Sequence, residues 1–199
     1  MEKKLKIAKR RSRIHGSGVV ATAPIRKGEH IVEYKGKLIT HDEADAGYHG
    51  ELNTGHTFLF TLNDDWIINA NVGGNIAKWI NCSCDPNAVA FVHEHPSKDS
   101  KRDQVIIEAL RAIKPGEEIT YDYGFEFDVP YTPELLEAWA CRCGSPKCKG
   151  TMLTLKKEDK KKAKKEDKKG LKDKKKEKKE KKDRKKNKKD RKKNKKGKK

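Results

Sequence analysis

The feature that most limits the fold of this chain is its last segment, from Lys156 to Lys199, which is almost entirely charged. The segment carries 29 Lys and Arg residues against 9 Asp and Glu residues, and its only apolar residues are Ala163 and Leu171. So little apolar surface cannot offset the conformational entropy that ordering would cost. We therefore expect residues 156–199 to be a disordered, lysine-rich tail.

The folded part of the chain is expected within residues 1–155. The net charge of +19 belongs to the tail, which leaves this body with 20 basic and 21 acidic residues. A body of this length is sufficient for one domain with a hydrophobic core. The cationic composition of the tail predicts sequence-independent binding to DNA phosphates. The tail has no aromatic residues for base stacking. A solvated tail that binds any polyanion is the alternative interpretation.

The amino-terminal residues and the cysteines bear on location. MEKKLKIAKRRSR lacks the apolar stretch of a secretory signal, and no apolar run is long enough to span a membrane. The cysteines lie in short clusters, which favours an intracellular protein whose thiols are free or bound to metal. A secreted protein with disulfides is the alternative.

The body has the pattern of short strands separated by turns. One strand is predicted over His30–Tyr34, and HTFLFTLNDDWIINA predicts a hairpin that turns at Asn63–Asp65. AVAFVHEH and DQVIIEAL predict a second strand pair, joined by a polar loop around Pro96–Arg102. Helices are predicted only for GGNIAKWI, with Asn75 near its start, and for TPELLEAWA. The second has Thr132 as its N-cap and Pro133 at the first helical position, so the fold class is mainly β.

One pattern occurs twice in the body. Ala21, Ile25, Gly28, Glu29 and Ile31 have the same spacing as Ala109, Ile113, Gly116, Glu117 and Ile119. Glycine in a turn permits a positive φ without a Cβ penalty. We interpret the two copies as similar hairpins with the same turn chemistry.

Three of the five cysteines, Cys141, Cys143 and Cys148, have the spacing C-x-C-x4-C in CRCGSPKC. A structural zinc site needs four ligands, so a fourth must come from elsewhere. Cys82 and Cys84 in WINCSCDPNA are candidates, as are the seven histidines, and spacing alone does not choose among them. Three free thiols on a polar loop are the alternative.

The order and spacing of several motifs resemble the SET-domain family of protein-lysine methyltransferases, and especially its trithorax-type branch with a cysteine-rich post-SET segment. The resemblance covers Ser12 to Leu155 and rests on RSRIHGSGVVA, IVEYKG, FLF, NANVGGNIAKWINCSCDPN, AIKPGEEITYDYGF and CRCGSPKC. It implies a mainly β, β-clip-like SET fold of short strands and small sheets, with a knot-like C-terminal segment. The implied boundaries are a basic N-terminal extension over 1–11, a SET domain over 12–127, a post-SET zinc segment over 128–155 and the tail over 156–199.

The resemblance also implies a site for S-adenosylmethionine. Asn81 is expected to hold the amino-acid portion of this cofactor, and Cys82, which replaces a usual histidine, is expected to reach the adenine through its backbone. Phe58 replaces a usual tyrosine beside the cofactor and the lysine channel, a loss of one hydrogen bond worth about 1 kcal/mol. The remaining expected contacts are backbone groups of His15, Gly16, Ser17 and Gly18.

The implied metal and catalytic residues follow from the same motifs. Cys84 is expected to complete a Zn²⁺ site with Cys141, Cys143 and Cys148, while Cys82 stays off the metal. Tyr123 is expected to place its hydroxyl near the reacting methyl group and amine, and Tyr121 to limit space and favour monomethylation. In-line methyl transfer requires a neutral amine, alignment with the departing sulfur and exclusion of water.

Three functions are compatible with these motifs to different degrees. The resemblance implies an S-adenosylmethionine-dependent protein-lysine N-methyltransferase, expected as a monomer, that acts on a histone or a histone-like, DNA-associated basic protein. The alternative is a catalytically degenerate SET fold that serves as a chromatin- or DNA-binding module, as Cys82 and Phe58 suggest. A plain nucleic-acid-binding zinc protein leaves ITYDYGF unexplained. The expected location is the nucleoid or cytoplasm in a bacterium, and chromatin in the nucleus of a eukaryote.

Overall fold

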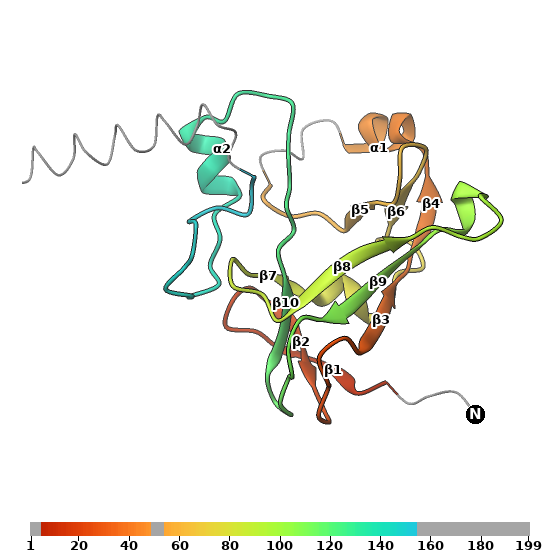
Figure 1. Ribbon diagram of the computed structural model, residues 1–199. Coiled ribbons are helices and arrows are strands. Elements are labelled where there is room, and N and C mark those ends of the chain that lie inside the picture. The colour runs from red at the N-terminus through yellow and green to blue at the C-terminus, as the bar shows by residue number, and fades with distance from the viewer. Residues whose placement is uncertain (1–4, 49–53, 155–199) are drawn as a thin grey trace, which may run out of the picture. The chain divides into compact units, whose positions relative to one another are not determined.

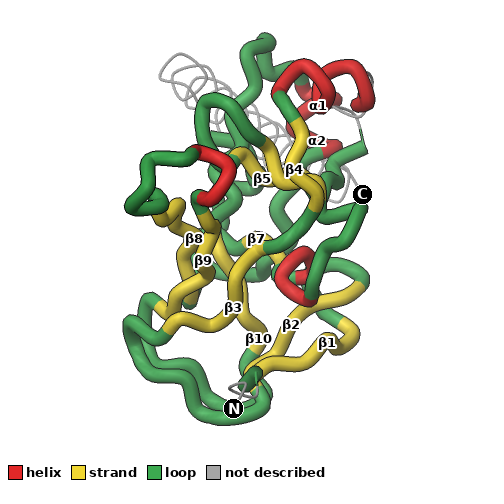
Figure 2. Tube along the Cα trace, turned by 90° about the vertical axis from the view of Figure 1, so that its right-hand side faces the viewer, coloured by secondary structure: helices red, strands yellow, loops and turns green. Residues whose placement is uncertain are grey.

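Short β-strands form three small sheets in the computed structural model, which describes residues 5–48 and 54–154 (Figures 1 and 2). The predicted lysine-rich tail lies outside the described residues. The mainly β fold class with few short helices is confirmed. Within the described ranges, no helix is long and apolar enough to span a membrane.

The first sheet brings together segments that are far apart in the sequence. Its strand order is β1-β2-β10-β7, so β10, the last strand among the described residues, lies between β2 and β7. Strands β1 and β10 are antiparallel to β2, whereas β7 is parallel to β10 and places Cys82 opposite Tyr121. The strands are β1 (Ile7–Arg11), β2 (Ser17–Ala21), β7 (Asn81–Cys82) and β10 (Glu118–Tyr121).

The other two sheets are antiparallel and contain the predicted hairpins. Strand β9 is central in the order β3-β9-β8, and β6 is central in the order β4-β6-β5. The predicted strand at His30–Tyr34 and the predicted turn at Asn63–Asp65 are confirmed. The strands are β3 (His30–Tyr34), β8 (Ala88–His93), β9 (Gln104–Ala109), β4 (Lys37–Ile39), β5 (Leu59–Thr61) and β6 (Ile67–Asn69).

The helices are few and short. Both predicted helices are present, as the 3₁₀ helix η2 (Ile76–Trp79) capped by Asn75 and as α2 (Pro133–Ala138) capped by Thr132. A second 3₁₀ turn, η3 (Ser100–Arg102), lies in the loop between β8 and β9. Helix α1 (His41–Tyr48) is not predicted from the sequence, since its segment HDEADAGY has no apolar periodicity.

The two copies of the repeated pattern are not separate hairpins, because they pair with each other. The amides and carbonyls of Ile25 and Ile113 exchange hydrogen bonds of 3.0 and 2.9 Å. The Gly28 amide donates to the Ala109 carbonyl at 2.8 Å, and the Gly116 amide donates to the Ala21 carbonyl at 2.8 Å. A pseudo-twofold axis therefore relates the two copies, and the glycine amide of each copy donates to the alanine carbonyl of the other.

One cluster of buried apolar side chains connects the three sheets. Val19 of β2 and Ile107 of β9 are each 0% exposed, and Ile68 of β6, in the third sheet, is 5% exposed. A smaller and separate cluster forms around Leu135 and Trp139 in residues 128–154, which we call the cysteine-rich segment. Figure 1 shows the chain after β10 rising past β8 toward α2, so this segment lies beyond the sheets.

Candidate functional site

The loop before β2 is fixed by a buried asparagine. Asn81, which is 9% exposed, donates from its side-chain amide to the carbonyls of His15 and Ser17 at 3.3 and 3.0 Å. The same amide donates to Oε1 of Glu118 at 2.9 Å, and Glu118 also accepts from the Ser12 hydroxyl at 2.8 Å. These contacts hold the loop of residues 15–18 against β10, although Asn81 and Glu118 are far from this loop in the sequence.

A cavity of about 330 Å³ opens beside this loop. Trp79 and Phe58 form one aromatic wall of the cavity, with ring centroids 5.2 Å apart in an edge-to-face arrangement. The cavity brings together most of the residues that the resemblance assigns to the cofactor, namely His15, Gly16, Ser17, Phe58, Asn81 and Cys82. Gly18 does not line the cavity; a Cβ at this position would collide with the Glu118 carboxylate.

A larger cavity of about 660 Å³ adjoins the first one. Tyr34, Phe60 and Tyr121 line the larger cavity alone, whereas Tyr123 and Trp139 line both. The tyrosines that the sequence analysis singles out, Tyr121 and Tyr123, have ring centroids 4.9 Å apart. The two cavities therefore share a wall that includes Tyr123 and Trp139.

The hydroxyl groups of the tyrosines are held as neutral donors. Tyr123 donates to the Ile80 carbonyl at 2.7 Å, and Tyr34 donates to the Phe58 carbonyl at 3.1 Å. Burial raises the pKa of Tyr34, Tyr121 and Tyr123 far above the usual value, because a phenolate would lose its hydration. The site thus contains tyrosines that remain protonated at physiological pH.

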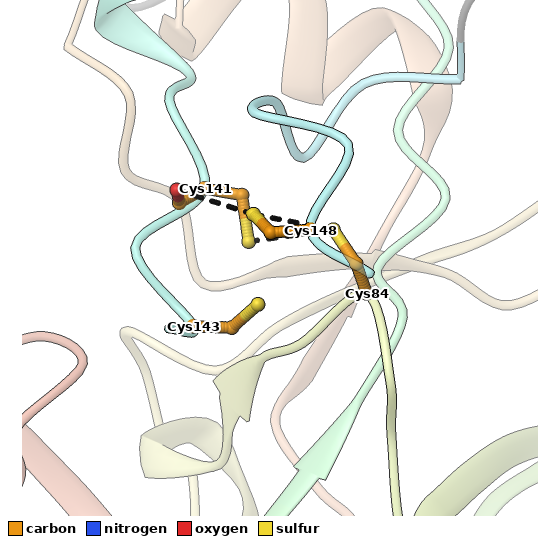
Figure 3. A group of neighbouring side chains, drawn as sticks. All are labelled: Cys84, Cys141, Cys143 and Cys148. Atoms are coloured by element: carbon orange, nitrogen blue, oxygen red, sulfur yellow. Dashed lines mark hydrogen bonds between the residues drawn. The ribbon is translucent and has the colours of Figure 1, made fainter. Parts of the chain in front are cut away.

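Four cysteine side chains converge on one another (Figure 3), and Ala140 and Arg142, the chain neighbours of Cys141, line the smaller cavity. The sulfur of Cys84 lies 3.6 Å from that of Cys141 and 3.9 Å from that of Cys148. With Cys143 included, all four sulfur atoms lie within 4.8 Å of one another, so the group can hold a metal ion. Of the two cysteines in WINCSCDPNA, the structure places Cys84 in this group.

The electrostatics of the thiols differ between the cysteine group and Cys82. Burial disfavours the Cys143 thiolate, but hydrogen bonds from the backbone amides of Cys84 and Ser145 outweigh this effect and lower the Cys143 pKa to about 6. Burial raises the pKa of Cys82 to about 12. Cys82 is only 3% exposed and lines the smaller cavity instead.

The cysteine-rich segment, residues 128–154, supplies part of the cavity walls. Trp139 follows α2, lines both cavities and is 3% exposed. The segment also meets the chain before β5 closely, since Gly55 has a φ of +65° and lies so near Ala138 that a Cβ would overlap the Ala138 carbonyl. Placement of this segment therefore decides the shape of both cavities.

Two further residues of the site are not predicted from the sequence. Glu118 organises the loop of residues 15–18 through Asn81, and Asn87 is a polar residue that is only 3% exposed. The Asn87 side chain accepts from the Thr120 amide at 2.9 Å and donates to the Glu118 carbonyl at 2.8 Å, so it fixes β10. A buried polar side chain needs such partners, but only the three-dimensional structure identifies them.

Comparison with known proteins agrees with this fold. Residues 16–124 match the SET domain family, and the chain therefore belongs to this family. It is 37% identical over 146 residues to the histone-lysine N-methyltransferase trithorax of Drosophila virilis, covering 70% of this chain and 3% of that protein. It is 38% identical over 142 residues to the H3 lysine-4 specific histone-lysine N-methyltransferase of Schizosaccharomyces pombe, covering 70% of this chain and 14% of that protein.

A solved structure shows the same fold. A humanized mutant of the Chaetomium thermophilum Polycomb Repressive Complex 2 aligns with a TM-score of 0.53 and 29% identity, over 62% of this chain and 15% of that chain. The chain thus spans a small fraction of the length of the relatives it matches.

Proposed function

We propose that this chain is an S-adenosylmethionine-dependent protein-lysine N-methyltransferase. The observation that carries this proposal is that Tyr123 lies on the wall that the two cavities share. A cofactor in the smaller cavity and a lysine stem in the larger one would approach each other at this point. Holding two reactants in line within a water-poor site is what a displacement at a methyl group requires.

The smaller cavity supplies groups suited to the cofactor. S-adenosylmethionine, when bound, supplies a methyl group on a positively charged sulfur. The backbone of residues 15–18 would contact its polar portion, with Asn81 holding this loop in place through the carbonyls of His15 and Ser17. Phe58 and the backbone of Cys82 would bound the cavity, because both residues line it.

The two tyrosines have separate roles in this proposal. The Tyr123 hydroxyl uses its only proton on the Ile80 carbonyl, so its oxygen lone pairs are available to accept a hydrogen bond from the substrate amine. Aromatic faces around the channel favour the cationic methylated product. Tyr121 fills space beside Tyr123, which favours addition of a single methyl group.

We propose Zn²⁺ as the metal of the cysteine group. Thiolates are ligands that Zn²⁺ accepts readily, with Zn–S distances of about 2.3 Å and sulfur atoms therefore about 3.8 Å apart in a tetrahedron. The sulfur separations of 3.6 and 3.9 Å from Cys84 support this fit. The ion would be held by Cys84, Cys141, Cys143 and Cys148, and it would fix the segment that carries Trp139.

Substitution Tyr123→Phe tests the proposed activity, because it removes one hydroxyl and little volume. Transfer of labelled methyl groups to a lysine peptide should fall by at least tenfold, while calorimetry should show cofactor binding close to that of the unmodified protein. Tyr131→Phe is the control, since Tyr131 lines neither cavity. Near-normal turnover in the Tyr123 variant would exclude Tyr123 as the catalytic residue. Cofactor binding without any turnover in the unmodified chain would instead favour a degenerate binding module.

The proposed substrate is a histone or a histone-like basic protein. The named relatives support this class, since they are histone-lysine N-methyltransferases. In a eukaryotic host such a substrate would place the protein on chromatin in the nucleus. The tail, with 29 basic and 9 acidic residues, would bind DNA through phosphates without reading sequence.

The tail proposal is tested by comparing the full chain with residues 1–155. The shorter chain should keep its activity on a short lysine peptide, because every residue assigned to the site precedes position 155. Its DNA affinity in a gel shift should fall strongly, and the dependence on salt should become shallow. Equal DNA affinity of the two chains at each salt concentration would show that the tail is not the anchor.

A further inference from the structure

Two carboxylates lie on the larger cavity, and they come from different walls. Asp45 belongs to α1, and Glu126 follows β10 on the segment that leads toward α2. Both side chains are exposed. Within residues 5–48 and 54–154, neither carboxylate has an ion-pair or hydrogen-bond partner. Most other residues that line this cavity are apolar or aromatic.

The lysine on the same cavity does not neutralise these carboxylates. Lys78 donates from its ammonium to the Ala70 carbonyl at 3.2 Å, and this ammonium lies 5.2 Å from the centroid of the Phe58 ring. It is therefore held toward the side where the two cavities meet. The walls that carry Asp45 and Glu126 present negative charge to whatever enters the larger cavity.

We propose that Asp45 and Glu126 are specificity-determining residues that select lysines flanked by cationic side chains. The inference rests on the proposed function, because it concerns the peptide that carries the methylated lysine. An extended peptide with its lysine stem at Tyr123 places neighbouring side chains near the two walls. A cation there meets a carboxylate of opposite charge, whereas an acidic side chain meets a like charge. A charge pair of this exposure changes affinity by about twofold to fivefold.

The lysine-rich tail of this chain has the composition that such a cavity would select. In KKDRKKNKKDRKKNKK nearly every lysine has another cation next to it. Methylation of tail lysines by a second copy or by the same chain is therefore expected to compete with external substrates. Mass spectrometry of the full chain after incubation with cofactor should find methylated lysines within residues 156–199.

The test uses the full chain and peptides that share a central lysine. One peptide has Lys or Arg on both sides of that lysine, one has Gln and one has Glu. Methyl-transfer kinetics should give a kcat/KM for the basic peptide that exceeds the Gln peptide by on the order of tenfold and the Glu peptide by more. The difference should lie in KM and should shrink as salt increases.

Matched variants assign the preference to the two carboxylates. Asp45→Asn and Glu126→Gln should each reduce the ratio of basic to neutral peptide by about twofold to fivefold. Asp64→Asn removes the same charge from an exposed turn outside both cavities, so it should leave the ratio unchanged. The double reversal Asp45→Lys with Glu126→Lys should make the Glu peptide the preferred one. Equal kcat/KM for all three peptides, or a ratio that follows Asp64 instead, would overturn the inference.

Failure of the proposed function gives a different result. If the unmodified chain methylates no peptide, the proposed methyltransferase activity is contradicted. The preference among the three peptides is then measured as binding, by fluorescence anisotropy. The tail is common to the unmodified chain and to Asp45→Asn with Glu126→Gln, so the two proteins are compared. A preference for the basic peptide that is stronger in the unmodified chain supports the role of the carboxylates even then, and the same preference in both proteins contradicts it.

Discussion

The interactions that stabilise the three sheets differ from those that stabilise the cysteine-rich segment of residues 128–154. The sheets share one apolar cluster in which Val19, Ile107 and Ile119 are fully buried, and the two repeated turns pair across it. The segment has only a small cluster around Leu135, Trp139 and Leu153, together with its thiols. Both regions supply walls to the cavities, so the site is only as stable as the weaker region.

Loss of metal should have the largest effect and should separate the two regions. Cys84→Ser removes one of four grouped thiols, so it should abolish metal binding and methyl transfer, because the segment that carries Trp139 loses its anchor. Cys82→Ser should keep the metal, since Cys82 lies in the smaller cavity. Metal content by mass spectrometry and activity are measured on both proteins. Equal metal loss from both variants would show that the two cysteines have been assigned wrongly.

Core truncation in each region should give the next largest effect. Ile113→Ala, at a side chain that is 1% exposed, should lower the free energy of unfolding by about 2–5 kcal/mol while the folded protein keeps its metal. Leu135→Ala, at a side chain that is 5% exposed, should instead weaken metal retention and activity with little change in the main unfolding transition. Urea denaturation and metal release are the measurements. If both variants shift the same transition equally, the regions unfold as one unit.

Alkaline pH should have the smallest effect for any single residue, and it should act through the buried tyrosines of the site together with Cys82, whose pKa burial raises to about 12. Burial raises the pKa of Tyr34, Tyr121 and Tyr123 in the folded protein above the ordinary value of 10.0. Their contribution to stability is complete below pH 10 and is lost as pH rises above it, because only the unfolded chain releases these protons. Above pH 10, each of these tyrosines lowers the free energy of unfolding by about 1.4 kcal/mol per pH unit.

Urea midpoints at pH 8 and pH 10.5, with metal bound, measure this loss. Tyr121→Phe should lose about 1 kcal/mol less than the unmodified chain between these two values, because one buried hydroxyl no longer titrates. An identical loss in the variant would contradict the assignment of the alkaline transition to Tyr121.

Much of the local structure could be predicted because local signals specify it. Thr132 with Pro133 marks the start of α2, Asn75 caps η2, and the turn at Asn63–Asp65 joins β5 and β6. Each of these depends on residues that lie within a few positions of one another. Helix α1 gave no such signal, since Ala44 is its one buried side chain among those described.

The sequence by itself determined the family, the strand-rich class and the residues available for chemistry, because short motifs keep their order and spacing. Only the tertiary structure decided which of these residues meet. Thiol spacing left Cys82 and Cys84 equivalent. The parallel pairing of β7 with β10 placed Cys82 opposite Tyr121, while Cys84 joined the other three cysteines. The repeated turns likewise pair with each other through Ile25 and Ile113. Such contacts join positions that are distant in the chain, and no local pattern encodes the partner of a buried amide or thiol.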